Sequence, residues 1–178
     1  MTLANKLTIF RIFLIPAFLI AFAIAGIGAA WVCLAIIVLA YVTDALDGWI
    51  ARKYNQITTF GKFMDPLADK LFVISAFICF VSIGEMPIWV LVIVLFREFI
   101  VDGIRMLAAS EGKVIPANQW GKWKLFSQIL LLISLCVDRI CNYGNGMVSL
   151  ILIYVMLILT VISGWTYLQQ NWKMLKFG

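Results

Sequence analysis

The sequence predicts an all-α integral membrane protein: one membrane domain, residues 1–178, with six transmembrane helices and a short N-terminal interfacial segment. Three observations predict this fold class. First, 64% of the residues are hydrophobic, which is more apolar surface than a soluble core of this size can bury. Second, the apolar residues form long runs that are separated by short turns. Third, lysine and arginine are scarce in every second turn, as they are in the outer loops of membrane proteins.

Each predicted element follows from an apolar run and from the residues that end it. Residues 1–10 are mildly amphipathic, so we expect them to lie at the membrane interface. The connections contain Gly, Pro or several polar residues, which interrupt helices; they lie at 26–28, 53–59, 84–87, 110–119 and 138–146. The runs between them have membrane-crossing length; we predict spans at about 11–27, 29–52, 60–84, 87–109, 120–137 and 147–172.

The distribution of positive charge predicts the orientation. Of the 14 lysines and arginines, only Arg139 falls in a connection on the side opposite the termini. The positive-inside rule therefore predicts that both termini lie in the cytoplasm. The first apolar run lacks a cleavage site, so we expect it to be retained as a helix. The formal charge of +5 fits orientation and anionic lipid headgroups, and we expect no nucleic-acid partner.

Two residue types limit the chemistry. The sequence has no histidine, which excludes phospho-histidine intermediates, Ser-His-Asp triads and metal sites built on imidazole. The four cysteines form no C-x-x-C pair and mostly lie in apolar runs. We expect them to pack in the core, with a disulfide near Cys141 as the less favoured alternative.

Four carboxylates lie within the stretch DALDGWIARKYNQITTFGKFMDPLAD, Asp44 to Asp69. If the flanks are helical, residues three or four apart share a face. Two stripes then form, with Asp44, Asp47, Gly48 and Ala51 on one helix and Gly61, Asp65 and Asp69 on the next. Two such helices facing each other would bring the four acids to one point.

A divalent cation would relieve the repulsion within such a cluster, because uncompensated charge near lipid is costly. Oxygen donors without nearby Cys or His suit Mg²⁺ or Mn²⁺, and four acids are enough for two ions. The alternative is that the acids are solvated loop residues between membrane helices. We favour that alternative for any single Asp, and the metal site for the full set in register.

The spacing D-x2-D-G-x2-A-R-x8-G-x3-D-x3-D is met in full between Asp44 and Asp69. In this motif and in its six predicted spans, the chain resembles the CDP-alcohol phosphatidyltransferase family over nearly its whole length. The segments FREFIVDGIR and GKVIPANQWGKWK resemble the bacterial phosphatidylglycerophosphate synthases within it. This resemblance implies a homodimer in the bacterial cytoplasmic membrane that transfers a phosphatidyl group from CDP-diacylglycerol to sn-glycerol 3-phosphate and releases CMP.

The resemblance also implies roles for individual residues. Asp44, Asp47 and Asp65 are expected to bind metal ions, and Asp69 to bind metal and to accept the proton of the attacking hydroxyl. The residues expected to contact CDP-diacylglycerol are Asn5, Thr8, Gly48, Ala51, Arg52, Thr58 and Gly61. Small residues on the first stripe would let the nucleotide approach the backbone, and an arginine pairs well with phosphate. Gly48 alone fits close helix packing equally well.

Basic residues in the second half of the chain are expected to select the acceptor. Arg97 falls well inside the fourth span, and Arg105 follows two turns later on a similar face. Lys122 and Lys124 begin the fifth span. A buried arginine in a membrane is costly and usually functional, here as a clamp for the phosphate of glycerol 3-phosphate.

Several alternatives stay open at this point. Arg97 fits a structural ion pair with Glu98 or Asp102, and the two lysines fit ordinary inner-side topology. The same family with inositol phosphate, serine or phosphatidylglycerol as acceptor is a second function. A divalent-cation transporter lined by the acids is a third function of a different class; the occurrence of the motif once, at one membrane face, disfavours it.

Overall fold

The computed structural model describes residues 3–24, 26–53, 59–110, 112, 115, 119–141 and 146–172. Within these ranges, the side chains of residues 3, 4, 49–52, 59, 60, 62 and 63 are not described. The described part contains six helices and no strand, which confirms the predicted all-α fold class. The helices are α1 (Leu3–Ile24), α2 (Ile27–Lys53), α3 (Thr59–Ser82), α4 (Ile88–Ser110), α5 (Gln119–Cys141) and α6 (Met147–Asn171).

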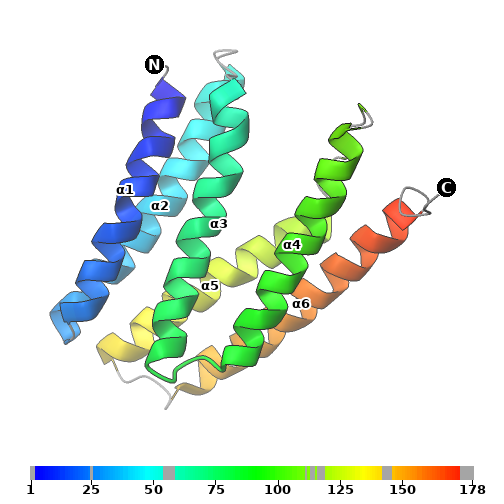
Figure 1. Ribbon diagram of the computed structural model, residues 1–178. Coiled ribbons are helices and arrows are strands. Elements are labelled where there is room, and N and C mark those ends of the chain that lie inside the picture. Colours follow the sequence, from blue (N-terminus) through cyan, green and yellow to red (C-terminus); the bar gives the residue numbers. More distant parts are fainter. Residues whose placement is uncertain are drawn as a thin grey trace.

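The six helices form two groups, α1–α3 and α4–α6, and α5 connects them through its contact with α2. α1 packs along both α2 and α3, whereas α5 packs against α6 and also reaches α2 (Figure 1). α4 packs on α6 and touches α3 only lightly. α1 begins and α6 ends toward the same end of the molecule (Figure 1). The loose contact of α3 with α4 and α5 leaves room between the groups for the site described below.

Several helix boundaries differ from the prediction, two of them at the start of the chain. α1 runs without a break through Arg11, so the segment expected at the interface is the first part of the same helix. At the first turn, Gly26 alone adopts a left-handed conformation with φ +97°, which only glycine adopts at little cost. The Ala30 amide then bonds to the Gly26 carbonyl at 3.1 Å, so Gly28 lies inside α2 instead of in the turn.

α5 continues to Cys141, four residues beyond the predicted end of the fifth span. Arg139, expected in a turn, therefore lies in the last turn of this helix, where a cation is favoured by the helix dipole. Its guanidinium stacks on the Phe22 ring at 4.4 Å and lies 3.9 Å from a Glu85 carboxylate oxygen. These contacts tie α1, α5 and the α3–α4 turn together.

Three helical segments of the described chain are long and apolar enough to cross a membrane: Asn5–Ile24, Ile27–Gly48 and Met147–Asn171. α3, α4 and α5 are 23 or 24 residues long, which is the length of a span. Their sequences carry charged residues such as Lys70, Arg97 and Lys124, which lower their hydropathy. The crossing of the membrane by these three helices stays a prediction.

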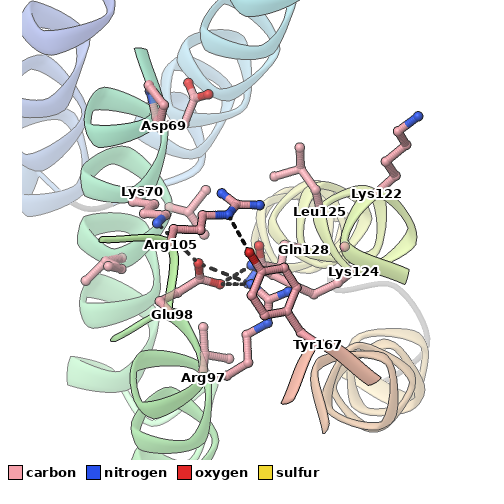
Figure 2. Close-up of a pocket in the computed structure, with 15 residues that line it drawn as sticks. Asp69, Lys70, Arg97, Glu98, Arg105, Lys122, Lys124, Leu125, Gln128 and Tyr167 are labelled. Carbon is pink, nitrogen blue, oxygen red and sulfur yellow. Dashed lines mark hydrogen bonds and ion pairs between the residues drawn. The ribbon is translucent and has the colours of Figure 1, made fainter. Parts of the chain in front are cut away.

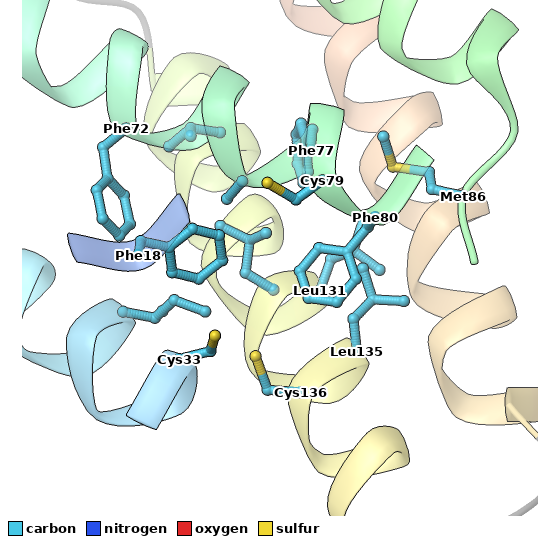
Figure 3. Close-up of a cluster of buried hydrophobic side chains, with 14 of the residues drawn as sticks. Phe18, Cys33, Phe72, Phe77, Cys79, Phe80, Met86, Leu131, Leu135 and Cys136 are labelled. Carbon is cyan, nitrogen blue, oxygen red and sulfur yellow. The ribbon is translucent and has the colours of Figure 1, made fainter. Parts of the chain in front are cut away.

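The hydrophobic core lies where α1, α2, α3 and α5 meet. Phe18 and Phe22 of α1 make edge contacts with Phe72 and Phe80 of α3, at ring-centroid distances of 5.8 and 5.2 Å. Leu131 and Leu135 of α5 close the cluster from the other side (Figure 3). As predicted, three cysteines are buried in it, Cys33, Cys79 and Cys136, and all four cysteines are free thiols.

Candidate functional site

The predicted acidic stripes form on α2 and α3. Asp44 and Asp47 lie one turn apart on α2, and Asp65 and Asp69 lie one turn apart on α3. Pro66 stands between the latter pair inside the helix. Its ring nitrogen lacks a proton and cannot bond to the carbonyl four residues earlier, which weakens α3 locally. The helix nevertheless keeps both acids on one face.

Arg11 of α1 joins three of these four acids. Its Nη1 lies 2.5 Å from Asp69 Oδ1 and 3.2 Å from Asp44 Oδ1. Its Nη2 lies 2.5 Å from Asp47 Oδ2. The Arg11 side chain is 1% exposed, so solvent screens these contacts little. One buried guanidinium therefore draws the two acidic stripes together.

The fourth acid is also held from α1. The Thr8 hydroxyl donates to Asp65 Oδ1, and both Thr8 and the neighbouring Asn5 are buried. Asn5, Thr8 and Arg11 are spaced three residues apart, so they form one buried polar stripe along a mainly apolar helix. This stripe faces the acids and completes a polar cluster, which we call the carboxylate cluster: Thr8, Arg11, Asp44, Asp47, Asp65 and Asp69.

Beside the carboxylate cluster, α3, α4, α5 and α6 line a pocket of about 250 Å³ that is open to solvent. The pocket is strongly basic (Figure 2). Its charged lining residues are Asp69, Lys70, Arg97, Glu98, Arg105, Lys122 and Lys124. All four basic residues predicted to select the acceptor therefore line one pocket, together with the acid expected to act as base.

Glu98 is the centre of the ionic network in this pocket. It is 6% exposed, and it pairs with Lys124, which is equally buried. The same carboxylate lies 3.3 Å from Arg97 Nη1 and 3.8 Å from Lys70 Nζ. The ion pair of Arg97 with Glu98, the alternative to a phosphate clamp, is thus present, whereas Asp102 pairs with Lys70 instead. Even with these ion pairs, the basic side chains that line the pocket outnumber the acidic ones, so its net charge is positive.

Arg97 runs through a narrow gap between two glycines. An added side-chain carbon at Gly164 of α6 would lie 3.1 Å from Arg97 Cγ, and one at Gly121 of α5 would lie 3.8 Å from Arg97 Nη2. Ser163 accepts hydrogen bonds from Arg97 Nε and Nη2 at 3.0 and 2.7 Å. These contacts fix the direction of the guanidinium, which is what a phosphate clamp requires.

Arg105 and Lys122 lie at the edges of the pocket. Arg105 Nε donates to the Tyr167 hydroxyl at 3.2 Å, and its guanidinium stands 5.6 Å from the centre of that ring. Lys122 is exposed and points away from Glu98 and its partners (Figure 2). Arg97 and Lys124 therefore belong to the ionic network around Glu98, whereas Arg105 and Lys122 border it.

The family is shown by comparison with known proteins. The sequence profile of the CDP-alcohol phosphatidyltransferase family matches residues 1–162. The chain belongs to this family. Its curated relatives include the CDP-diacylglycerol--glycerol-3-phosphate 3-phosphatidyltransferase of Bacillus subtilis, 38% identical over 98% of this chain and 97% of the relative. The enzyme of that name from Haemophilus influenzae is 39% identical over 92% and 89%.

A further relative comes from Mycobacterium tuberculosis. It is described as a probable phosphatidylglycerophosphate synthase, and it is 39% identical over 94% of this chain and 80% of its own length. Each of these relatives aligns along more than nine tenths of this chain. Membership of a transferase family disfavours the cation-transporter alternative.

CDP-alcohol phosphatidyltransferases generally depend on a divalent metal, and the donor set of the carboxylate cluster fits one. Four carboxylates and one guanidinium leave a surplus of negative charge, and the donors are all oxygens. Among the described side chains, no three acids are spaced to hold an ion directly. Three of the four acids instead contact Arg11.

The predicted contacts to CDP-diacylglycerol are described only in part. Asn5 and Thr8 are buried in α1 beside the acids, Gly48 is half-buried in α2, and Gly61 is buried near the start of α3. Thr58 and the side chains of Ala51 and Arg52 lie outside the described residues.

Sequence reasoning missed the roles of Arg11, Lys70, Ser163 and Tyr167. It also missed that Glu98 is the centre of the ionic network. A signal for Arg11 was present, because a polar stripe at three-residue spacing in an apolar helix indicates a buried partner. Lys70 follows Asp69 directly and lies inside the third predicted span, where a charge is costly. Ser163 and Tyr167 carry no such signal, since Ser and Tyr are ordinary residues of membrane helices.

Proposed function

We propose that this protein transfers a phosphatidyl group from CDP-diacylglycerol to sn-glycerol 3-phosphate, with release of CMP. One observation carries the proposal: Asp69 belongs both to the carboxylate cluster and to the lining of the basic pocket. A donor bound at the cluster and an anionic acceptor bound in the pocket would meet at this residue. The names of the Bacillus subtilis and Haemophilus influenzae relatives describe the same reaction.

The donor diphosphate would bind at the carboxylate cluster. Asp44, Asp47 and Asp65, with Asp69, would hold Mg²⁺ or Mn²⁺, with two ions as the expected number. Bound there, the ions supply charge stabilisation for the diphosphate oxygens. Residues Asn5, Gly48, Ala51, Arg52, Thr58 and Gly61, with Thr8, would line the nucleotide. Small residues keep the helix surface open to it, and Arg52 would pair with a phosphate.

The acceptor phosphate would bind among the basic side chains. A phosphate monoester carries nearly two negative charges at neutral pH, and it would find Arg97, Arg105 and Lys124 already oriented by their neighbours. Lys122 would contribute from the rim. A neutral or zwitterionic acceptor such as serine would leave this surplus of positive charge without a partner, which is why we favour glycerol 3-phosphate.

The reaction itself is an in-line displacement at phosphorus. A free hydroxyl oxygen of glycerol 3-phosphate attacks the phosphorus that carries the diacylglycerol. The bond from that phosphorus to the CMP oxygen breaks, and CMP leaves with the electron pair. Asp69 takes the hydroxyl proton, because it stands between the two binding regions. Binding both substrates against one residue also supplies the orientation that such a step requires.

The membrane setting follows from the two substrates. The lipid donor would enter sideways from the inner leaflet, while the acceptor arrives from the cytoplasm. We therefore propose a multi-pass protein of the bacterial cytoplasmic membrane, with six crossings and with the active site and both termini on the cytoplasmic side. A homodimer is the expected assembly.

Substrate competition tests the proposed function. The protein is purified in detergent with Mg²⁺ or Mn²⁺ and given CDP-diacylglycerol, and CMP release is measured with glycerol 3-phosphate, inositol phosphate, serine or phosphatidylglycerol. We expect release only with glycerol 3-phosphate. Release with another acceptor would keep the family and discard this substrate. Divalent-ion flux into vesicles without CMP formation would revive the transporter.

Gly164→Ala is predicted to weaken acceptor binding selectively. The new methyl group would stand 3.1 Å from Arg97 Cγ, so the side chain must shift and its guanidinium with it. We expect the KM for glycerol 3-phosphate to rise by about tenfold, the loss of roughly one charge-assisted hydrogen bond. The KM for CDP-diacylglycerol should stay within twofold of its original value.

Gly103→Ala is the matched control for this substitution. Gly103 lies in α4, the helix of Arg97, and an added carbon there meets nothing within 4 Å. Both changes exchange glycine for alanine inside a helix, so both gain about 0.5–1 kcal/mol from helix propensity. Equal KM values for glycerol 3-phosphate in the two variants would show that Arg97 does not bind the acceptor.

A further inference from the structure

Arg11 takes no part in the proposed reaction, yet it makes the most contacts within the carboxylate cluster. Its two terminal nitrogens contact Asp47 at 2.5 Å, Asp69 at 2.5 Å and Asp44 at 3.2 Å. The three acids come from α2 and α3, so one guanidinium joins three helices. The same three acids are expected metal ligands, and their oxygens have a limited number of lone pairs.

We infer that Arg11 is a positioning residue: it is the built-in counter-cation of the carboxylate cluster, and it competes with divalent metal ions for Asp44, Asp47 and Asp69. The inference rests on the proposed function for the metal ions themselves. It goes further by assigning to α1, which supplies no acid, the control of how tightly the ions bind. It also accounts for a fully buried arginine in a mainly apolar helix.

Two physical effects make the competition strong. An oxygen lone pair that accepts a guanidinium N–H is not free for a metal ion, so ion binding must lengthen or break at least one of the three contacts. In addition, a guanidinium stays positively charged at every working pH. It repels a divalent ion nearby, and burial leaves that repulsion poorly screened. Without Arg11, the acids would bind ions more tightly but would repel one another more strongly when no ion is bound.

A small cavity lies beside the Arg11 guanidinium. It has room for about one water molecule, and it is lined in part by Arg11, Tyr41, Asp44 and Asp69. Within the described part of the chain, Arg11 Nε and the Tyr41 hydroxyl are buried without a hydrogen-bond partner. Buried polar groups normally have partners. A guanidinium that released an acid would therefore find a hydroxyl acceptor in the same cavity, and this lowers the cost of ion binding.

The test measures Mn²⁺ binding to the purified full-length protein in detergent, by the electron paramagnetic resonance signal of free Mn²⁺, without either substrate. For Arg11→Gln we expect the Mn²⁺ dissociation constant to fall by about tenfold or more, because one unit of positive charge is removed from beside the ligands. In EDTA the same variant should unfold at a lower temperature than the original protein, and Mn²⁺ should raise its midpoint by a larger amount. A merely structural role would not tighten Mn²⁺ binding.

Three further variants sharpen the test. Arg139→Gln removes an arginine that is also held by an acid and a ring, at the other end of the bundle, and should leave Mn²⁺ affinity unchanged. Arg11→Lys keeps the charge but cannot reach three acids at once, so its affinity should lie between those of Arg11→Gln and the original protein. Tyr41→Phe removes the second acceptor and should weaken Mn²⁺ binding by a few-fold.

Several results would overturn the inference. If Arg11→Gln and Arg11→Lys are both folded and bind Mn²⁺ no more tightly than the original protein, competition is contradicted. Mn²⁺ binding by none of the proteins contradicts it as well, and if Arg11→Gln does not fold, Arg11→Lys decides alone. The proposed function fails separately, through absence of CMP release with glycerol 3-phosphate in the original protein, because Mn²⁺ binding is measured without substrates.

Discussion

Asp69→Asn is expected to lower the rate of CMP release by about 10²–10⁴-fold, the usual contribution of a positioned acid or base. The amide keeps the shape of the side chain but cannot take a proton from the acceptor hydroxyl, and it is a poor metal ligand. The 2.5 Å contact with Arg11 would also lose its ionic character. Initial rates of CMP release at saturating substrates measure this effect directly.

Asp138→Asn is the matched control for Asp69→Asn. Asp138 accepts a hydrogen bond from Ser149 and lines a separate pocket with Glu85 and Arg139. It belongs neither to the carboxylate cluster nor to the basic pocket. We expect this variant to retain its CMP release within about twofold, as for ordinary substitutions away from the site. A similar loss in both variants would show that the Asp69 effect is a general loss of fold.

Glu98→Gln is expected to have the largest effect on stability. Glu98 is the one described acid that contacts Lys124, Arg97 and Lys70 together. Loss of its charge would leave a buried ammonium beside a guanidinium without compensation, which costs about 3–5 kcal/mol. Thermal unfolding in detergent, followed by the tryptophan signal, should show a midpoint lowered by many degrees.

Two companion variants separate charge from packing. Glu98→Gln combined with Lys124→Met removes both members of the buried pair, so most of the lost stability should return. Glu85→Gln breaks a half-exposed pair with Arg139, which is worth about 0–1 kcal/mol. If the double variant were as unstable as Glu98→Gln alone, the effect would come from packing of the glutamate side chain and not from uncompensated charge.

Helix phase made the acidic site predictable. The number of helices and the pairing of Asp44 with Asp47 and of Asp65 with Asp69 follow from local spacing alone, because residues three or four apart share a face. The position of Arg11 does not follow from such spacing. It depends on how α1 is rotated against α2 and α3, and that rotation is set by packing across the bundle. The sequence pattern therefore identifies Arg11 only as the start of the first predicted span.

The basic pocket was likewise predictable only in part. The sequence indicated four of the five basic residues that line it, all except Lys70, because a charge inside an apolar span needs a reason. It did not indicate their partners. Asp102 was considered for Arg97, its near neighbour in sequence, but it pairs with Lys70 of another helix. Likewise, Ser163 and Tyr167 orient two arginines across the contact between α4 and α6, a contact that only tertiary packing determines.

The central claim is that the carboxylate cluster and the basic pocket form one active site, joined at Asp69. The most direct test is mass spectrometry of the products formed by the purified protein from CDP-diacylglycerol and glycerol 3-phosphate. We predict that CMP and phosphatidylglycerophosphate appear in equal amounts, and that Asp69→Asn loses both. CMP formed at the same rate without glycerol 3-phosphate, with phosphatidic acid as the lipid product, would contradict the claim, because water would then be the acceptor and the pocket would have no part in the reaction.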